Sequence, residues 1–353
     1  MKTHRELAPV FTKGKLGLLA LAALVPLFIA AKATQQGAPA QAESRRLTRV
    51  QGEIGRLEAL SGGKAGVAAI HLESGRTVYF GADDRYPMAS TYKIPIAVQL
   101  LHRVDQGQIR LGQMITLKPN DLHPGSGTIS RLLNDPGVSL SLANLLELML
   151  IISDNSATDL VLKAAGGPQA VTNRLRELEV DGIRVDRPTL NLIADWAGIK
   201  LPDGEWNPDG FADLYREVPE LRREAASITF NGDPRDTSTP RGMTRLLEKI
   251  WRGQAVSPDS TRLLLDIMRR CETGPNRLKG LLPPFVEVAH KTGTIGGTSN
   301  DVGIITLPDG AGHVAVSVFI KESERDVAQR EKAIAHISRA VYDFFLLQPE
   351  AEE

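Results

Sequence analysis

The spacing of apolar residues predicts two groups of strands separated by a long helical segment. Leucine, valine and isoleucine recur at helical intervals over residues 43–62, which predicts an amphipathic helix that ends at Ser61-Gly62-Gly63. A terminal amphipathic helix is predicted over residues 327–347. Short apolar runs bounded by turn residues predict five strands, at 65–72, 77–80, 286–289, 302–307 and 313–320.

The segment between the strand groups has a helical pattern over much of its length. One helix is predicted from Ser90 to about Gln106, and another over Ser139–Ile152, which is apolar on nearly all sides and should be buried. Further helices are predicted over Asn155–Ala165 and after the capping pairs Thr239-Pro240 and Ser257-Pro258. Strands at both ends of the chain with a helical insertion predict an α/β (α+β) fold with one antiparallel sheet.

Composition and charge add two restrictions to this prediction. The 353 residues include 42 basic and 42 acidic side chains, so the charge balance does not indicate a nucleic-acid partner. Residues 1–42 hold five of the basic residues and one acid, which leaves 37 basic and 41 acidic residues, or −4, in the rest. Cys271 is the single cysteine, so no internal disulfide can form. We expect its side chain to be buried near a helix end, as a small hydrophobic group.

The N-terminus has the pattern of an export signal. Lys13 and Lys15 precede the uncharged apolar run Leu16–Ala31, and the small-x-small sequence Ala40-Gln41-Ala42 follows, which indicates a cleavable signal peptide. The alternative is an uncleaved inner-membrane anchor formed by residues 16–31, although this run is shorter than the roughly 20 residues that a spanning helix prefers. Both interpretations predict an exported protein, periplasmic or extracellular.

A serine stands three residues before a lysine in the sequence MASTYK, residues 88–93. This offset places the Ser90 and Lys93 side chains on one face of the predicted helix. A lysine in a dry pocket or beside a second cation can lose its proton and act as a base for a serine nucleophile. Ser61 and Lys64 have the same spacing, but they lie in a Gly-rich turn that cannot hold the pair on a helix face.

Two further motifs follow in order. Ser153-Asp154-Asn155 comes directly after the predicted buried helix, and Lys291-Thr292-Gly293-Thr294 lies on a predicted strand. Taken singly, the first could be only a helix cap and the second only a strand lysine followed by a turn. Strand alternation should turn His290 away from Lys291, which predicts a structural role for the histidine. The three motifs in this order are the set found in class A β-lactamases and penicillin-binding proteins.

The chain resembles the class A serine β-lactamases from about residue 45 to 346, with further local matches at PGSG (124–127) and RDTSTP (235–240). The resemblance implies a β-lactamase-like fold, in which a five-stranded antiparallel sheet is flanked by helices and an all-helical subdomain is inserted. It implies a monomeric serine hydrolase that opens β-lactam rings without a metal or cofactor. Its partner would be a small-molecule β-lactam or a peptidoglycan-derived peptide, with no nucleic acid.

The resemblance also implies roles for the first two motifs. Ser90 would be the acylated nucleophile, and Lys93 would be its base or proton relay. Ser153 would pass a proton to the leaving nitrogen. Asn155 would hold the substrate amide and help to position Lys93.

The third motif would bind the substrate. The resemblance implies that Lys291, Thr292 and Thr294 bind the substrate carboxylate, and that Gly293 lets the substrate backbone lie close to the strand. The backbone N–H groups of Ser90 and Thr294 would form the oxyanion hole. On this basis residues 1–42 are a signal peptide or anchor, and residues 43–353 are one catalytic domain. Its α/β part covers about 43–88 and 280–353, and its helical part about 89–279.

The chain departs from the class A pattern in the Ω-loop, residues 184–236, which should carry the glutamate that activates the deacylating water. An alignment anchored on Leu190-Asn191 places Arg187 at that position, and one anchored on Asp186-Arg187 places Thr189 there. Neither supplies a carboxylate. Asp236 should close the loop by pairing with Arg184 or Arg187.

The same loop is also unusually long. About 40 residues separate Asn191 from Arg235, and their aromatic and apolar side chains predict an ordered lid. The sequence predicts one helix in this lid, with four apolar residues on one face: Phe211, Leu214, Val218 and Leu221.

Two interpretations of the deacylation step stay open. Asp186, Asp195 or Glu205 could activate the water, which would make the protein a β-lactamase with a changed deacylation route. Alternatively, deacylation is slow, as in a penicillin-binding D,D-carboxypeptidase-like enzyme or a non-hydrolytic β-lactam-binding sensor. The intact Ser-Lys, Ser-Asp-Asn and Lys-Thr-Gly motifs argue against an inactive protein, because each of them serves acylation.

Overall fold

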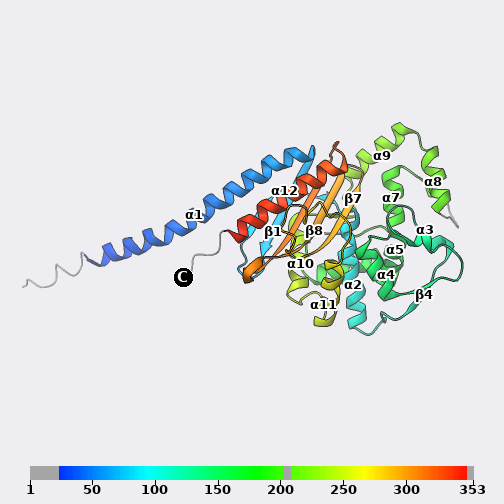
Figure 1. The fold of residues 1–353 in the computed structure, drawn as a ribbon, viewed down its shortest axis with the longest axis horizontal. Coiled ribbons are helices and arrows are strands. Elements are labelled where there is room, and N and C mark those ends of the chain that lie inside the picture. The colour runs from blue at the N-terminus through cyan, green and yellow to red at the C-terminus, as the bar shows by residue number, and fades with distance from the viewer. Residues whose placement is uncertain (1–23, 202–207, 348–353) are drawn as a thin grey trace, which may run out of the picture. The chain divides into compact units, whose positions relative to one another are not determined.

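The computed structural model, which describes residues 24–201 and 208–347, contains a five-stranded antiparallel sheet (Figure 1). The strand order is β2-β1-β9-β8-β7, so strands from both ends of the chain join in one sheet, as predicted. The strands are β1 (Lys64–His71), β2 (Thr77–Phe80), β7 (Val288–Ile295), β8 (Thr298–Thr306) and β9 (His313–Lys321). β7 continues past the apolar run that ends at residue 289 and carries residues 291–294, which were placed on a strand by the sequence, because residues 290–295 also pair with β8.

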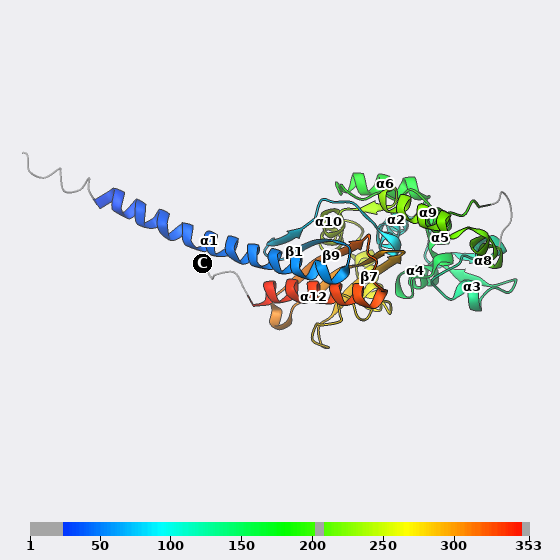
Figure 2. The same ribbon diagram turned by 90° about the horizontal axis from the view of Figure 1, so that it is seen from above.

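Helices cover both faces of the sheet, which explains why its strands are apolar along most of their length. α12 (Val327–Leu346) packs against β8 and β9, whereas α10 (Pro240–Trp251) packs against β1 and β9 from the other face (Figure 2). α11 (Pro258–Arg269) packs against β7. Thr244 of α10 bonds to the buried hydroxyl of Ser317 on β9 at 2.8 Å, so a polar contact fixes this layer.

The first helix, α1 (Leu24–Ser61), covers the predicted helix over residues 43–62 except for its last residue. The chain divides into a compact unit of residues 50–350 and a second unit of residues 1–49 with 351–353. The part of α1 within the compact unit buries Val50 and Ile54. The predicted signal or anchor, residues 16–31, lies partly outside the described residues, and no described helix is long and apolar enough to cross a membrane.

The predicted helical block is confirmed, with corrections at two helix starts. The helix predicted from Ser90 begins at Lys93, because residues 89–92 form a short 3-10 helix. Residues 139–141 form a short strand, β5, which pairs with β4 (Met114–Thr116). Ser141 Oγ accepts a hydrogen bond from the N–H of Asn144, and this cap starts the helix at Leu142. The helices of the block are α2 (Lys93–Asp105), α3 (Ile129–Leu132), α4 (Leu142–Ile151), α5 (Asn155–Ala164) and α6 (Pro168–Glu177).

The lid is ordered over its described residues and consists of α7 (Thr189–Ala197), α8 (Pro208–Glu217) and α9 (Glu220–Gly232). It has a small apolar core of its own, which includes Ala194, Phe211 and Val218. The prediction of a single helix is wrong, because Pro219 precedes α9 and Leu221 is 80% exposed. Glu205 lies outside the described residues, as does Trp206. Short strands β3 (Tyr86–Pro87) and β6 (Thr237–Ser238) pair near the base of the lid.

Candidate active site

Ser90 lies in a strained turn directly before α2. The turn is a short 3-10 helix, η1 (Ala89–Tyr92), and Ala89 has a φ of 45°, in the left-handed region that disfavours side chains. Gly293 of β7 lies against this turn, because a Cβ at residue 293 would be 3.0 Å from Ser90 N and 2.6 Å from the Met88 carbonyl oxygen. The motif glycine is therefore required by the protein's own turn at Ser90, a reason that the sequence did not indicate.

Lys93 is fully buried, and its amine contacts the second motif. Nζ lies 2.7 Å from the Ser153 carbonyl oxygen, 3.0 Å from Ser153 Oγ and 3.0 Å from Asn155 Oδ1. Burial, reinforced by the charge of Lys291, holds the pKa of the Lys93 amine well below its ordinary range. A neutral amine here can donate to the carbonyl and amide oxygens and accept from the Ser153 hydroxyl, which suits proton transfer.

The second motif lies in a constrained connection between α4 and α5. Ser153 has a φ of 61°, again in the left-handed region. Asp154 caps α5 by accepting a hydrogen bond from the N–H of Ala157 at 2.9 Å. Asn155 Nδ2 donates to the carbonyl oxygen of Pro124 at 2.8 Å. The second motif therefore does include a helix cap, at Asp154. This cap fixes the positions of Ser153 and Asn155 on either side of it.

A cavity of about 430 Å³ opens at Ser90. Three predicted site residues line it: Ser90, Asn155 and Thr294. Tyr92, the loop at 125–126, the turn at 295–296 and the start of α12 contribute further lining, and α7 contributes four residues: Thr189, Leu192, Ile193 and Trp196. Among the described residues, no carboxylate lines this cavity.

β7 carries the third motif past the turn that holds Ser90. Lys291 is buried, and its Nζ donates to the carbonyl oxygen of Thr292 at 2.9 Å. Arg277, also buried, donates to Thr294 Oγ1 at 2.6 Å and to the Gly293 carbonyl oxygen at 3.0 Å. The charge of Arg277 also acts on Lys291. Two cations beside threonine hydroxyls are suited to binding a carboxylate.

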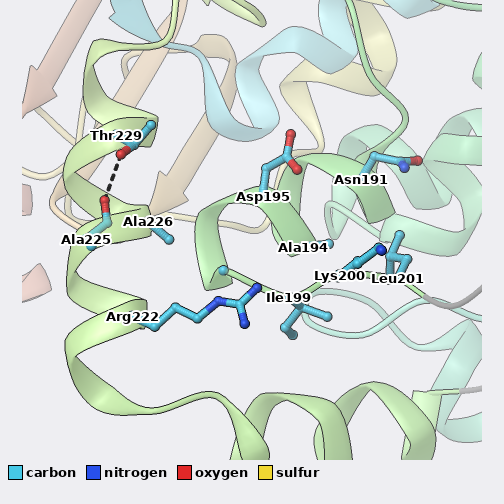
Figure 3. A pocket seen from close by; sticks show the side chains of 11 residues that line it. Asn191, Ala194, Asp195, Ile199, Lys200, Leu201, Arg222, Ala225, Ala226 and Thr229 are labelled. Atoms are coloured by element: carbon cyan, nitrogen blue, oxygen red, sulfur yellow. Dashed lines mark hydrogen bonds between the residues drawn. The ribbon is translucent and has the colours of Figure 1, made fainter.

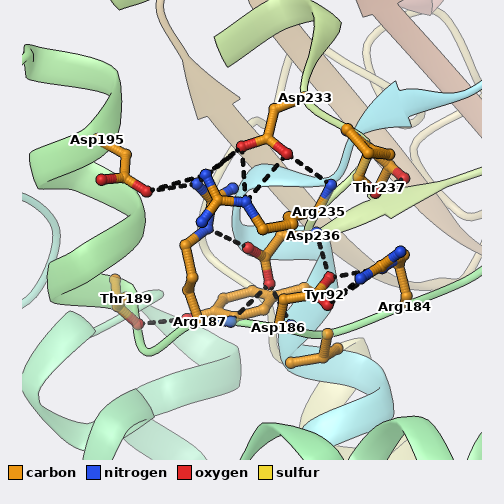
Figure 4. Close-up of polar contacts among 12 residues, drawn as sticks. Tyr92, Arg184, Asp186, Arg187, Thr189, Asp195, Asp233, Arg235, Asp236 and Thr237 are labelled. Atoms are coloured by element: carbon orange, nitrogen blue, oxygen red, sulfur yellow. Dashed lines mark hydrogen bonds and ion pairs between the residues drawn. The ribbon is translucent and has the colours of Figure 1, made fainter.

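Ion pairs close the lid at its base (Figure 4). Arg187 Nε lies 2.6 Å from Asp236 Oδ2, and its Nη1 lies 2.6 Å from Asp195 Oδ2. Arg184 pairs instead with Asp186, at 2.5 Å. Arg187 is therefore the partner of Asp236, which supports the alignment anchored on Asp186-Arg187. Two carboxylates predicted as alternative bases, Asp186 and Asp195, are both held by arginines.

This alignment places Thr189 where class A enzymes carry the deacylating glutamate. Thr189 Oγ1 hydrogen-bonds the buried hydroxyl of Tyr92 (Figure 4). Burial keeps the pKa of Tyr92 well above its ordinary value, so this hydroxyl stays protonated at neutral pH. Asp159 fixes the start of α7 by accepting from the N–H groups of Thr189 at 2.7 Å and Leu190 at 3.2 Å. His123 Nε2 lies 3.0 Å from the same carboxylate.

A second cavity, of about 670 Å³, lies between α7 and α9 (Figure 3). Its lining includes Asn191 and Asp195 from α7 and Arg222 and Thr229 from α9, with Lys200 between the helices. Asn191 lines this cavity and not the one at Ser90.

Two residues of the site were missed by sequence reasoning. Arg277 lies in a polar loop with glycine and proline, where nothing local distinguishes a buried arginine from an exposed one. Asp159 lies four residues after Asn155 on α5, and this helical offset is a signal that could have identified it. Among the described residues, no group of three histidine, cysteine or acidic side chains could hold a metal ion.

The fold brings the Ser90 turn, the buried amine of Lys93 and the Ser153-Asp154-Asn155 connection together beside one cavity. The model of the Beta-lactamase enzyme family matches residues 49–345, and the chain belongs to this family, among its class A serine enzymes.

Relatives and solved structures match over most of their length. β-Lactamase VEB-1 of Pseudomonas aeruginosa is 30% identical over 291 residues, which cover 80% of this chain and 86% of that protein. The carbapenem-hydrolyzing β-lactamase KPC of Klebsiella oxytoca is 29% identical over 286 residues, covering 80% and 85%. An ancestral class A β-lactamase structure has a TM-score of 0.68 at 34% identity, covering 83% and 99%. A β-lactamase structure from Chitinophaga pinensis has a TM-score of 0.67 at 30% identity, covering 84% and 98%.

Proposed function

We propose that the protein hydrolyses β-lactam antibiotics through an acyl-enzyme on Ser90 and so confers resistance to them. The observation that carries this proposal is the buried amine of Lys93, which contacts Ser153 and Asn155 beside the Ser90 cavity. A buried amine with a lowered pKa is the kind of base that a serine nucleophile needs at neutral pH.

Acylation would proceed by a closed cycle of proton transfers. The Lys93 amine takes the hydroxyl proton of Ser90 while Ser90 Oγ forms a bond to the β-lactam carbonyl carbon. The backbone N–H groups of Ser90 and Thr294 hold the oxyanion that results. The ring C–N bond then breaks, and the Ser153 hydroxyl gives its proton to the ring nitrogen. Ser153 regains a proton from Lys93, which leaves an ester on Ser90 and a neutral lysine.

Substrate binding would use groups on both sides of Ser90. Asn155 Nδ2 donates one hydrogen to Pro124 and keeps a second for a carbonyl oxygen of the substrate. The substrate carboxylate would meet the cations and hydroxyls of β7 and the loop before it: Lys291, Thr292, Thr294 and Arg277.

Deacylation is proposed to be the slower half of the reaction. The residues of α7 that line the Ser90 cavity include Thr189, with its hydroxyl, and the apolar Leu192 and Ile193. None of the described α7 residues in this lining is a carboxylate. The Lys93 amine is neutral again after acylation, and we propose it as the base for the hydrolytic water. An enzyme that uses one amine for both steps lacks the separate deacylating base of other class A enzymes. Its acyl-enzyme should therefore accumulate.

A time course of intact protein mass after mixing with a penicillin tests both parts of the proposal. The adduct should appear, persist during turnover, and decay once the drug is consumed. Ser90→Ala and Lys93→Ala should form no adduct on this timescale. Lys64→Ala is the matched control, because Lys64 follows Ser61 with the same spacing but is exposed and pairs with Glu322.

Other outcomes of this experiment lead elsewhere. An adduct that forms and never decays favours a penicillin-binding enzyme or sensor. Labelling of Ser90→Ala would contradict the nucleophile assignment. Rapid decay without accumulation would contradict slow deacylation and point to a carboxylate outside the described residues, with Glu205→Gln as the next variant.

We also propose that the catalytic domain is exported to the periplasm or beyond the cell and acts there as a monomer. The apolar run at residues 16–31 and the small-x-small sequence at residues 40–42 support export. The N-terminal sequence of protein recovered from the cell fractions distinguishes a cleaved signal, which would begin near Glu43, from a retained inner-membrane anchor.

A further inference from the structure

Among the described residues that line the Ser90 cavity, Arg330 of α12 has the only charged side chain. Arg330 is 4% exposed, and its Nη1 donates to the carbonyl oxygen of Gly296 at 2.7 Å. Its Nε is buried without a hydrogen-bond partner, and the guanidinium forms no ion pair with a described carboxylate. Because a buried charge without a counter-ion is costly, this guanidinium is suited to binding a negatively charged group.

The carboxylates whose charges act on Arg330 have partners elsewhere. Asp326 Oδ1 accepts from the N–H of Gln329 at 2.8 Å, and Glu331 Oε1 accepts from Arg277 Nε at 3.1 Å. Burial, followed by the charge of Arg277, outweighs both carboxylates and holds the pKa of Arg330 below its ordinary value. An arginine nevertheless stays charged at neutral pH. The described residues therefore leave the charge of Arg330 only partly compensated.

A second donor without a partner reaches the same turn from the lid. Trp196 of α7 lines the cavity, and its buried Nε1 has no hydrogen-bond partner in the described part of the chain. Nε1 lies against Gly296, because a Cβ at residue 296 would be only 2.6 Å from it. Trp196 and Arg330 therefore approach one residue, Gly296, from two different helices, and each keeps an N–H group without an acceptor.

Apolar side chains surround these two donors. Ile193, Ile295 and Val327 line the same cavity, and each lies within three residues of Trp196, Gly296 or Arg330 in the chain. Apolar walls with a few polar groups are typical of a site for a small organic ligand. This end of the cavity is thus suited to an aromatic group that carries a carboxylate.

This end of the cavity is distinct from the part of β7 that holds Lys291. Lys291 Nζ donates to the carbonyl oxygen of Thr292, whereas Arg330 donates to that of Gly296, four residues later. At the rise of a strand these two carbonyls are roughly 13 Å apart. Gly293, which lies against Ser90 N, comes between them. One carboxylate cannot contact both cations, so Arg330 would bind a second anionic group of the substrate.

We propose that Arg330 and Trp196 form an anion subsite of the Ser90 cavity, which binds a carboxylate on the acyl side chain of a β-lactam. This inference rests on the proposed β-lactamase function. In a penicillin the ring carboxylate and the acyl side chain extend from opposite ends of the fused rings. When the ring carboxylate lies toward Lys291, the side chain extends past Ser90 toward Gly296. The enzyme should therefore prefer a penicillin whose aromatic side chain carries a carboxylate.

Two penicillins that differ by one carboxylate test this preference: benzylpenicillin and its α-carboxy derivative. The value of kcat/KM is compared, because it includes no step after acylation and slow deacylation does not affect it. The wild-type protein should favour the α-carboxy derivative roughly tenfold, the effect of one charge-assisted hydrogen bond. Arg330→Gln should abolish this preference, and Trp196→Phe, which removes only the N–H donor, should reduce it roughly threefold.

The ratio of the two kcat/KM values separates substrate binding from a structural role. Arg330 also holds the Gly296 turn, so Arg330→Gln could slow both reactions, but a structural defect changes both and leaves their ratio the same. Arg330→Lys keeps the charge and should keep part of the preference. Arg339→Gln is the matched control, because Arg339 lies on the same helix, pairs with Asp343 and does not line the cavity.

The inference is overturned if the wild-type protein does not favour the α-carboxy derivative, or if Arg330→Gln and Trp196→Phe both keep the wild-type ratio. Unfolding curves identify a variant that fails to fold. If the Arg330 variants fail, the ratios of the wild-type protein and of Trp196→Phe still decide the question.

Binding to Ser90→Ala protein separates this inference from the proposed function, because it requires no reaction. Calorimetry should give a Kd for the α-carboxy derivative roughly tenfold below that for benzylpenicillin, and adding Arg330→Gln should remove the difference. If this difference is found but the wild-type protein forms no acyl-enzyme, the proposed function is wrong and the anion subsite stands. If the wild-type protein hydrolyses both penicillins and the two Kd values are equal, only the anion subsite is refuted.

Discussion

Replacing Asp236 by asparagine should reduce the free energy of unfolding more than breaking an exposed ion pair does. The Asp236 side chain is fully buried, and its Oδ2 accepts from Arg187 Nε at 2.6 Å. Its Oδ1 accepts from the backbone N–H groups of Asp186 at 2.7 Å and Arg187 at 3.1 Å. Asp236 also has a φ of 51°, which asparagine tolerates, so the substitution removes the charge without adding backbone strain.

The expected cost follows from what Arg187 retains. Removing one partner of a buried ion pair costs about 3–5 kcal/mol, mainly because the other charge is left unpaired. Arg187 Nη1 still lies 2.6 Å from Asp195 and 3.1 Å from Asp233, so its charge keeps some compensation. We therefore expect the lower end, a loss of about 3 kcal/mol in the free energy of unfolding for Asp236→Asn.

Urea unfolding of the purified protein measures this loss, and limited proteolysis of residues 184–236 shows whether the lid opens first. Asp213→Asn is the matched control, because Asp213 pairs with Arg216 on the exposed surface of α8 and should change stability by less than about 0.5 kcal/mol. If Asp236→Asn is as stable and as resistant to protease as this control, the Arg187–Asp236 pair does not hold the lid.

Three further predictions concern the site itself. Gly293→Ala would place a Cβ 3.0 Å from Ser90 N, so the acylation rate constant should fall roughly 100-fold, as when an oxyanion donor is lost; an unchanged burst would contradict this. Arg277→Gln should raise KM for a penicillin roughly tenfold, with a smaller effect on kcat, since it removes a charge-assisted contact. A fall in kcat as large as the rise in KM would contradict a role in ground-state binding. Lys291→Met should move the acid limb of single-turnover acylation to higher pH. The Lys93 base is lost as the pH falls through its pKa, and that pKa rises when the neighbouring cation is removed. A limb at unchanged pH would show that burial alone sets the Lys93 pKa.

The sequence by itself determined the sheet, the main helices and the order of the motifs. Apolar residues with a period of two or of 3.6 identify strands and helices directly, because each element buries one side or both. The offset between Ser90 and Lys93 is also local, since the turn η1 and the start of α2 carry both residues. Two other helix boundaries differ from the prediction. Ser141 Oγ caps α4 by accepting from the N–H of Asn144, and Pro219, which has no N–H, separates α8 from α9.

Only the tertiary structure decided what lies around these motifs. Arg184 and Arg187 are equally good partners for Asp236 in the sequence, and the folded lid brings Arg187 to it and leaves Arg184 with Asp186. The burial of Arg277 and its contacts with Asn300 and Glu331 likewise depend on segments distant in the chain. The physical reason is that burial and charge compensation are set by groups packed from several elements, whereas periodicity and spacing report on one element at a time.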